Sequence, residues 1–336
     1  MLGGILLFII VFMLSLTMGA YQFEDKTLSS LWLKVFTNPN DLSKGDYYVI
    51  FSIRLPRVIM GSLIGSALAL SGTALQGMFK NPLATPSLIG VNSGASLFAA
   101  VAIVIGAGWR SFLPDYLQYS LISIMAFLGA ILTMTIVYRV STTQKKTNVV
   151  IMLLAGVAIS ALAGAVTGFL TYLTNDEELR NLTFWTLGSL GGATWTKNSI
   201  LLLVILISFI ILLPKGKVLN ALMLGDKDAA HLGIPVEKTK KQIIFLTALM
   251  VGVSVAFAGA IGFVGLIVPY ILRLIFKSDY NFILPSSAIF GSILLVLADT
   301  ISRTIVAPAE LPIGILTASL GAPVFIAILI RYKKSF

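Results

Sequence analysis

The chain has 336 residues, of which 57% are hydrophobic and 11% are charged. Soluble globular domains carry about 25% charged residues, so this composition excludes a water-soluble protein and predicts an all-α integral membrane protein. The net charge of +10 falls mainly on short loops between apolar segments, which argues against nucleic-acid binding, and the absence of cysteine excludes disulfides and thiolate metal sites.

Apolar runs of about 20 residues, the length that crosses a membrane, recur along the whole chain. The first run lacks a basic flank and an A-x-A site, so we expect a retained span rather than a cleaved signal peptide. The run over 242–276 is too long for one crossing, and Gly259, Gly262 and Gly265 predict a turn inside it. Pro269 predicts a short, kinked second helix after that turn. The other eight predicted spans, which make ten in a single domain of residues 1–336, cover 2–20, 58–77, 88–107, 119–138, 149–171, 198–213, 284–302 and 312–331.

Basic residues are distributed unevenly between the two sets of loops. An even number of spans places both termini on one side, and the loops of that side carry most of the lysines and arginines. The opposite loops carry most of the acidic residues. Since basic loops face the cytosol, we expect a multi-pass protein of the cell membrane with both termini and the large loop 214–241 in the cytosol.

Within that loop, the stretch LGDKDAAHLGIP, residues 224–235, predicts one short helix. Asp226 suits the N-cap position, His231 falls in the last turn, Gly233 suits the position after the C-cap, and Pro235 ends the helix. So short a helix is unstable alone and needs tertiary support or a partner. The chain's only histidine has no nearby ligand cluster, so we interpret it as a cap-region residue and predict no metal site.

Arginines flank the predicted external ends of two spans. Arg54 and Arg57 precede the second span, and Arg303 follows the ninth. Asp299 lies four residues before Arg303 on the same helix face, and an acid at a span's end is costly unless it is paired. The pair can be an interfacial anchor. The arginines can equally bind the carboxylates of an acidic partner protein.

Small residues crowd the stretch 61–96, where Gly61 and Gly65 begin a G-x-x-x-G pattern. Small residues let membrane helices approach closely, and we expect tight packing within one subunit rather than a specific dimer contact. The chain contains no phosphate-binding loop, so we expect neither nucleotide hydrolysis nor a cofactor bound by this chain itself.

Seven ordered blocks resemble the FecCD family of permeases, the membrane subunits of binding-protein-dependent ABC importers for iron–siderophores, haem and cobalamin. The resemblance implies a type II ABC importer permease with ten spans. It rests on RLPR (54–57), ALSGTALQGMFKNPLATPSLIGVNSGA (69–95), LLAGVAIS (153–160), LGDKDAAHLGI (224–234), AGAIGFVGLIVPYILRLI (258–275), LLVLADTISR (294–303) and ELPIGILTASLGAPVFIAIL (310–329).

The resemblance also assigns roles and partners. It implies two ATP-binding subunits that hold ATP and Mg, a second permease subunit in a homodimer or heterodimer, and an extracytoplasmic substrate-binding protein. The family's docking arginines match Arg54 or Arg57, together with Arg303, and all three are candidate docking residues. The cytosolic gate matches Asn81, Pro82 and Leu83 and, less closely, Asn148 and Val149. The residues expected to couple to the ATPase are Gly225, Asp226, Asp228, Ala229, His231, Leu232 and Gly233.

The cargo stays open at this level. Haem would usually need an axial ligand, and the only histidine lies in a predicted cytosolic loop, so we favour an iron(III)–siderophore over haem or cobalamin. Many relatives have a histidine where this chain has Tyr270, so a role of that histidine does not transfer. A stand-alone secondary carrier is the alternative of another class, although Asp299 is the one clear acid in the spans. An intramembrane enzyme lacks a nucleophile–base or metal constellation.

Overall fold

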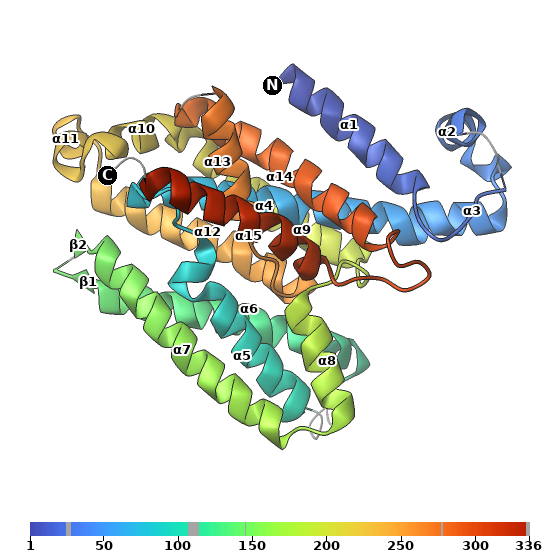
Figure 1. Ribbon diagram of the computed structural model, residues 1–336, viewed down its shortest axis with the longest axis horizontal. Coiled ribbons are helices and arrows are strands. Elements are labelled where there is room, and N and C mark those ends of the chain that lie inside the picture. The colour runs from blue at the N-terminus through green and yellow to red at the C-terminus, as the bar shows by residue number, and fades with distance from the viewer. Residues whose placement is uncertain (25–27, 107–113, 145, 277, 334–336) are drawn as a thin grey trace.

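The computed structural model describes residues 1–24, 28–106, 114–144, 146–276 and 278–333, and these form a bundle of elongated helices (Figure 1). Residue 107, the expected end of the third span, lies outside the described residues. The helices are α1 Leu2–Thr17, α2 Leu28–Thr37, α3 Lys44–Tyr48, α4 Leu55–Phe79, α5 Val91–Val104, α6 Asp115–Ser141, α7 Val149–Leu173, α8 Asp176–Leu187, α9 Trp195–Leu212, α10 Gly216–Leu224, α11 Asp226–His231, α12 Val236–Ala258, α13 Val264–Phe276, α14 Tyr280–Ser302 and α15 Ile313–Lys333. A two-stranded antiparallel hairpin, β1 Thr142–Thr143 and β2 Lys146–Thr147, joins α6 to α7.

The helices reproduce the expected series of spans. Within the described residues, seven helices are long and apolar enough to cross a membrane, and three shorter apolar helices, α1, α5 and α13, accompany them. Each of the ten predicted spans therefore corresponds to an apolar helix, and the multi-span, all-helical fold is confirmed. The run over 242–276 is divided as expected: α12 ends before Gly259, whose φ of +74° starts the turn into α13.

The second span begins earlier than the sequence predicts. Instead of starting at residue 58, the helix is continuous over Lys44–Phe79 and passes through one π-helical segment, Val49–Arg54. Arg54 and Arg57 look like residues before a span, but both lie inside this helix and are buried. These two charges can be buried because other elements supply carbonyl partners for Arg54 and carboxylate partners for Arg57.

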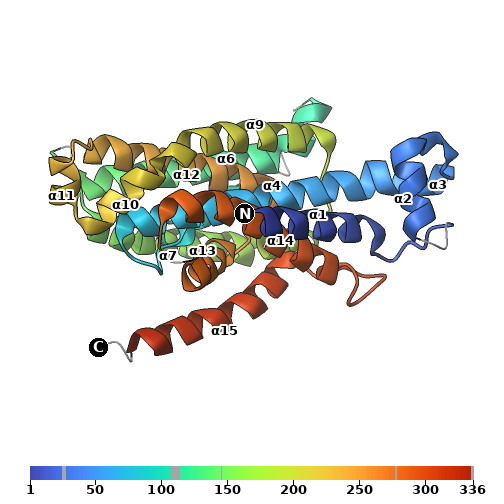
Figure 2. The ribbon, with the colours of Figure 1, turned by 90° about the horizontal axis from the view of Figure 1, so that it is seen from above.

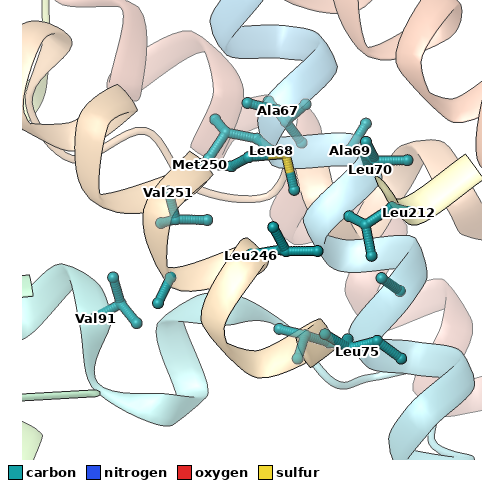
Figure 3. Packing of buried hydrophobic residues seen from close by; sticks show 14 of the residues in the cluster. Ala67, Leu68, Ala69, Leu70, Leu75, Val91, Leu212, Leu246, Met250 and Val251 are labelled. Atoms are coloured by element: carbon teal, nitrogen blue, oxygen red, sulfur yellow. The ribbon is translucent and has the colours of Figure 1, made fainter. Parts of the chain in front are cut away.

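Helix α4 forms the centre of the bundle and packs against α12, α13 and α14 (Figure 2). Its side chains meet those of α12 in the main hydrophobic core, where Leu68 and Met250 lie close together (Figure 3). Small residues bring the backbones into contact: a Cβ on Gly72 would lie 1.9 Å from the carbonyl oxygen of Gly265 in α13. The prediction of tight packing within one subunit is confirmed at this crossing.

The two ends of the molecule carry different features. Helices α10 and α11 lie at one end of the long axis, and α2 and α3 lie at the other (Figure 1; Figure 2). The predicted coupling residues and the predicted docking arginines therefore lie far apart along the bundle.

Candidate functional site

Two backbone hydrogen bonds around Gly233 form the C-terminal end of helix α11. Gly233 has a φ of +80°, its N–H donates to the carbonyl of Ala230, and the N–H of Ile234 donates to the carbonyl of Ala229. This pair of bonds is a Schellman motif, which requires the left-handed conformation that glycine adopts easily. The predicted C-terminal end of the helix is confirmed.

The predicted N-cap is wrong by one residue. The N-cap is Gly225, with a φ of +145°, and Asp226 is the first residue of the helix. The carboxylate of Asp226 instead accepts from the ammonium of Lys240 at 2.6 Å and pairs with Lys80 at 3.2 Å. Partial burial alone would raise the pKa of Asp226, but the hydrogen bond and charge of Lys240, aided by Lys80, lower it below its usual value. The carboxylate therefore stays ionised and holds α11 against α12 and the end of α4.

Exposed apolar side chains lie before and after α11, whose own exposed residues include the polar Asp226, Lys227 and His231. Met223 and Leu224 at the end of α10 and Leu232 after α11 are solvent-exposed, with Leu224 and Leu232 exposed by 69% and 65%. Ala229, one of the predicted coupling residues, is fully buried and anchors the helix. His231 is exposed in the last turn, as expected of a cap-region residue. Gly225 is the N-cap of α11, Asp228 lies in its first turn, and Gly233 follows its C-cap.

The residues predicted to form the cytosolic gate line separate cavities. Asn148 accepts from the N–H groups of Val150 and Ile151 and so caps α7, which Val149 begins. It lines a hollow of about 620 Å³ together with Asp226 and Lys240. Leu83 lines an apolar cavity of about 250 Å³ near α13 and α15, next to the turn that Asn81 and Pro82 form.

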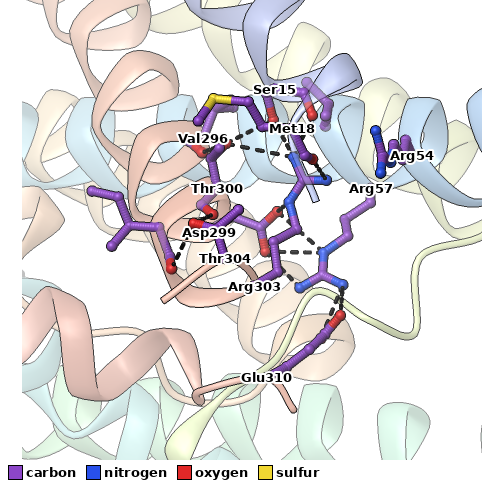
Figure 4. A network of polar contacts seen from close by, with 12 residues as sticks. Ser15, Met18, Arg54, Arg57, Val296, Asp299, Thr300, Arg303, Thr304 and Glu310 are labelled. Carbon is purple, nitrogen blue, oxygen red and sulfur yellow. Dashed lines mark hydrogen bonds and ion pairs between the residues drawn. The ribbon is translucent and has the colours of Figure 1, made fainter. Parts of the chain in front are cut away.

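At the other end of the bundle, the three predicted docking arginines lie together but are only 4–7% exposed (Figure 4). Arg57 donates from Nε and Nη2 to the Asp299 carboxylate at 2.9–3.1 Å. It also donates from Nη1 to Glu310 at 2.8 and 3.0 Å. The Nε of Arg303 lies 3.4 Å from the Oδ2 of Asp299, an oxygen that Arg57 also contacts. The predicted Asp299–Arg303 pair is confirmed, and Arg57 and Glu310 join it.

Two of these arginines also complete the end of α1, a role that sequence reasoning missed. Arg54 donates to the carbonyls of Leu16 and Thr17 at 2.9 and 2.7 Å. Arg303 donates to the carbonyls of Ser15 and Met18. The last carbonyls of a helix have no partner within it, and cations are favourable there. No local signal marks this contact, because the first helix and Arg303 lie almost 300 positions apart in the sequence.

Among the described residues, no group of three or more His, Asp or Glu side chains can hold a metal ion. The geometry thus consists of two polar assemblies at opposite ends of an apolar bundle. One is a buried ion cluster, and the other is a short polar helix flanked by exposed apolar side chains. Neither assembly combines a nucleophile with a base, and both are suited to binding or movement.

Comparison with known proteins shows which family the chain belongs to. The model of the FecCD transport family matches residues 7–331. The chain is 39% identical to the hemin transport system permease protein HmuU of Yersinia pestis, over 99% of this chain and 96% of the relative. It is also 39% identical to the vitamin B12 import system permease protein BtuC of Salmonella typhi, over 87% of this chain and 86% of the relative.

A solved structure covers nearly the whole fold. It is described as an inward-facing conformation of a metal-chelate type ABC transporter. It is 31% identical in sequence, covers 98% of both chains and superposes with a TM-score of 0.84. The similarity extends along the full series of helices, including the regions that carry both polar assemblies.

Proposed function

Since the chain belongs to the FecCD transport family, we propose that it is the membrane permease subunit of a binding-protein-dependent ABC importer. The observation that carries this proposal is the match across residues 7–331 together with the exposed short helix α11. Uptake proceeds by alternating access without covalent chemistry in this chain. ATP is hydrolysed in two partner subunits, and the permease lies in the cell membrane with both termini in the cytosol.

For the cargo, we propose a metal held in a tetrapyrrole-type ring, as in haem or cobalamin. The support is the 39% identity to permeases named for hemin and for vitamin B12. This preference replaces the sequence-based expectation of an iron(III)–siderophore, which no named relative supports specifically. The earlier objection, that haem needs an axial ligand, carries little weight because a permease can move a cargo that its binding protein ligates.

The test is uptake by vesicles that contain the permease, its ATP-binding subunit and its binding protein. Haem and cobalamin are supplied separately, with a ferric hydroxamate as the siderophore comparison, and internal cargo is measured by its absorbance. ATP-dependent accumulation of a tetrapyrrole supports the cargo proposal, and accumulation of the hydroxamate alone contradicts it. Uptake driven by an ion gradient without ATP would support the stand-alone carrier instead.

The coupling surface is proposed to be α11 and the apolar side chains beside it, Leu224 and Leu232. Both leucines are exposed. Helix α11 lies at one end of the long axis of the bundle (Figure 1). Helices α7 and α15 have few buried residues, which supports contact with a second permease subunit along these helices.

The turn Asn81–Leu83 and the start of α7 are proposed to gate the cytosolic end of the pathway.

Replacing Asp226–Gly233 with a Gly/Ser linker of equal length is expected to uncouple the transporter. ATP hydrolysis should continue at its basal rate, while ATP-driven uptake should fall to background because nothing rigid remains to transmit movement. Lys238→Ala is the control, since that side chain is exposed and lies in α12, outside the replaced segment. Uptake that survives the linker would contradict the coupling role.

Docking of the binding protein is proposed at the cluster around Arg57. Because Glu310 already occupies the Nη1 of Arg57, a carboxylate of the binding protein must compete with it. Glu310→Gln is therefore expected to tighten docking several-fold and to make it more dependent on salt, since the freed guanidinium is available. Binding is measured on immobilised permease at two salt concentrations, and unchanged affinity would locate the docking site elsewhere.

A further inference from the structure

Lys240 is a lysine that the bundle buries almost completely. Its side chain is 2% exposed, although it lies only four residues after the start of α12 and beside the exposed Lys241. A buried ammonium is strongly unfavourable unless carboxylates surround it. Two carboxylates contact it, those of Asp226 in α11 and of Glu237, three residues earlier in α12.

The first carboxylate connects Lys240 to the short helix. Asp226, the first residue of α11, accepts from the Lys240 Nζ at 2.6 Å. Asp226 also pairs with Lys80, the left-handed residue that ends α4. Any displacement of α11 therefore pulls on an ammonium embedded in the membrane helix α12.

The second carboxylate connects Lys240 to the hairpin before α7. Glu237 lies 3.4 Å from the Lys240 Nζ through one oxygen. Its other oxygen accepts from the N–H of Thr147 in β2 at 2.9 Å. Thr147 is followed directly by Asn148, which caps α7. The Lys240 ammonium thus contacts α11 through Asp226, and its second partner Glu237 holds the hairpin that leads into α7.

We propose that Lys240 is the positioning residue through which movement of α11 reaches α12 and the start of α7. The inference rests on the proposed function and adds the element that relays the movement inward. Short, nearly rigid ionic contacts suit this task, whereas exposed ion pairs are weak and yield easily. Lys240 is 2% exposed and Asp226 is 46% exposed, so the contact differs from an ordinary surface pair in that its lysine is buried.

The test compares variants in vesicles that contain the complete transporter, with ATP hydrolysed and cargo imported both measured per assembled complex. Lys240→Met and Asp226→Asn are each expected to raise the ATP consumed per imported cargo about tenfold, within the range usual for coupling between sites. The double variant should do no worse than Lys240→Met, because that substitution already removes the Asp226–Lys240 contact. Lys240→Arg should restore part of the coupling, and Lys241→Met, the neighbouring control, should leave the ratio unchanged.

Asp226→Asn leaves Lys240 paired with Glu237, so it keeps the test decisive where Lys240→Met lowers the amount of folded protein. An unchanged ratio of ATP to cargo in Asp226→Asn, with only reduced thermal stability, overturns the inference because the contact would then serve the fold alone. Additive losses in the double variant overturn it as well. Failure of the unsubstituted transporter to import any cargo with ATP overturns the proposed function itself, and the inference with it.

Discussion

Gly72→Ala is expected to prevent the permease from folding stably, whereas Gly61→Ala in the same helix is expected to be tolerated. A Cβ at position 72 would lie 1.9 Å from the carbonyl oxygen of Gly265 and 2.7 Å from its Cα. These are backbone atoms, so α13 as a whole must move away from α4. The expected cost exceeds the ~3 kcal/mol at the upper end of ordinary overpacking.

Gly61 provides a matched control in α4. Its added Cβ would meet the Leu190 Cδ1 at 3.1 Å and the Val296 Cγ2 at 3.6 Å, and the first is the flexible end of a side chain. Both substitutions make the same change in helix propensity, roughly 1 kcal/mol in favour of alanine. Thermal unfolding in detergent, followed by the fraction that remains monodisperse on size exclusion, separates the two. Equal midpoints would contradict the close crossing of α4 and α13.

Asp299→Ala is expected to have the second largest effect. The carboxylate is 2% exposed and serves two buried guanidinium groups, those of Arg57 and Arg303. Removing it leaves Arg57 with only the half-exposed Glu310, and leaves Arg303 with carbonyl and hydroxyl partners alone. Breaking a buried ion pair from one side costs about 3–5 kcal/mol, because the remaining charge has already lost its water.

The control for Asp299→Ala is Glu310→Gln. The Glu310 side chain is 46% exposed, so water can replace much of what its charge contributes. We expect the unfolding midpoint of Glu310→Gln to stay near that of the unsubstituted protein, while Asp299→Ala unfolds at a clearly lower temperature. If the two variants unfold together, the cluster does not stabilise the junction of α1, α4 and α14.

The features that local sequence specifies were predicted well. The composition indicated a membrane bundle, and the length of the apolar run over 242–276 with its glycines indicated the hairpin of α12 and α13. The end of α11 followed from Gly233, because a left-handed residue after a helix needs only its immediate neighbours. These features depend on spans of a few to about twenty residues, over which backbone conformation and hydropathy act directly.

The partners of the charged residues required the tertiary structure. Arg57 meets Asp299 and Glu310 from 242 and 253 positions away, and nothing in the local sequence indicates which helices become neighbours. Lys240 resembles the exposed lysines around it until α11 and the β1–β2 hairpin close over it. Burial of a charge depends on how elements far apart in the chain pack together, so the ion cluster around Arg57 and the burial of Lys240 became visible only once the helices were packed.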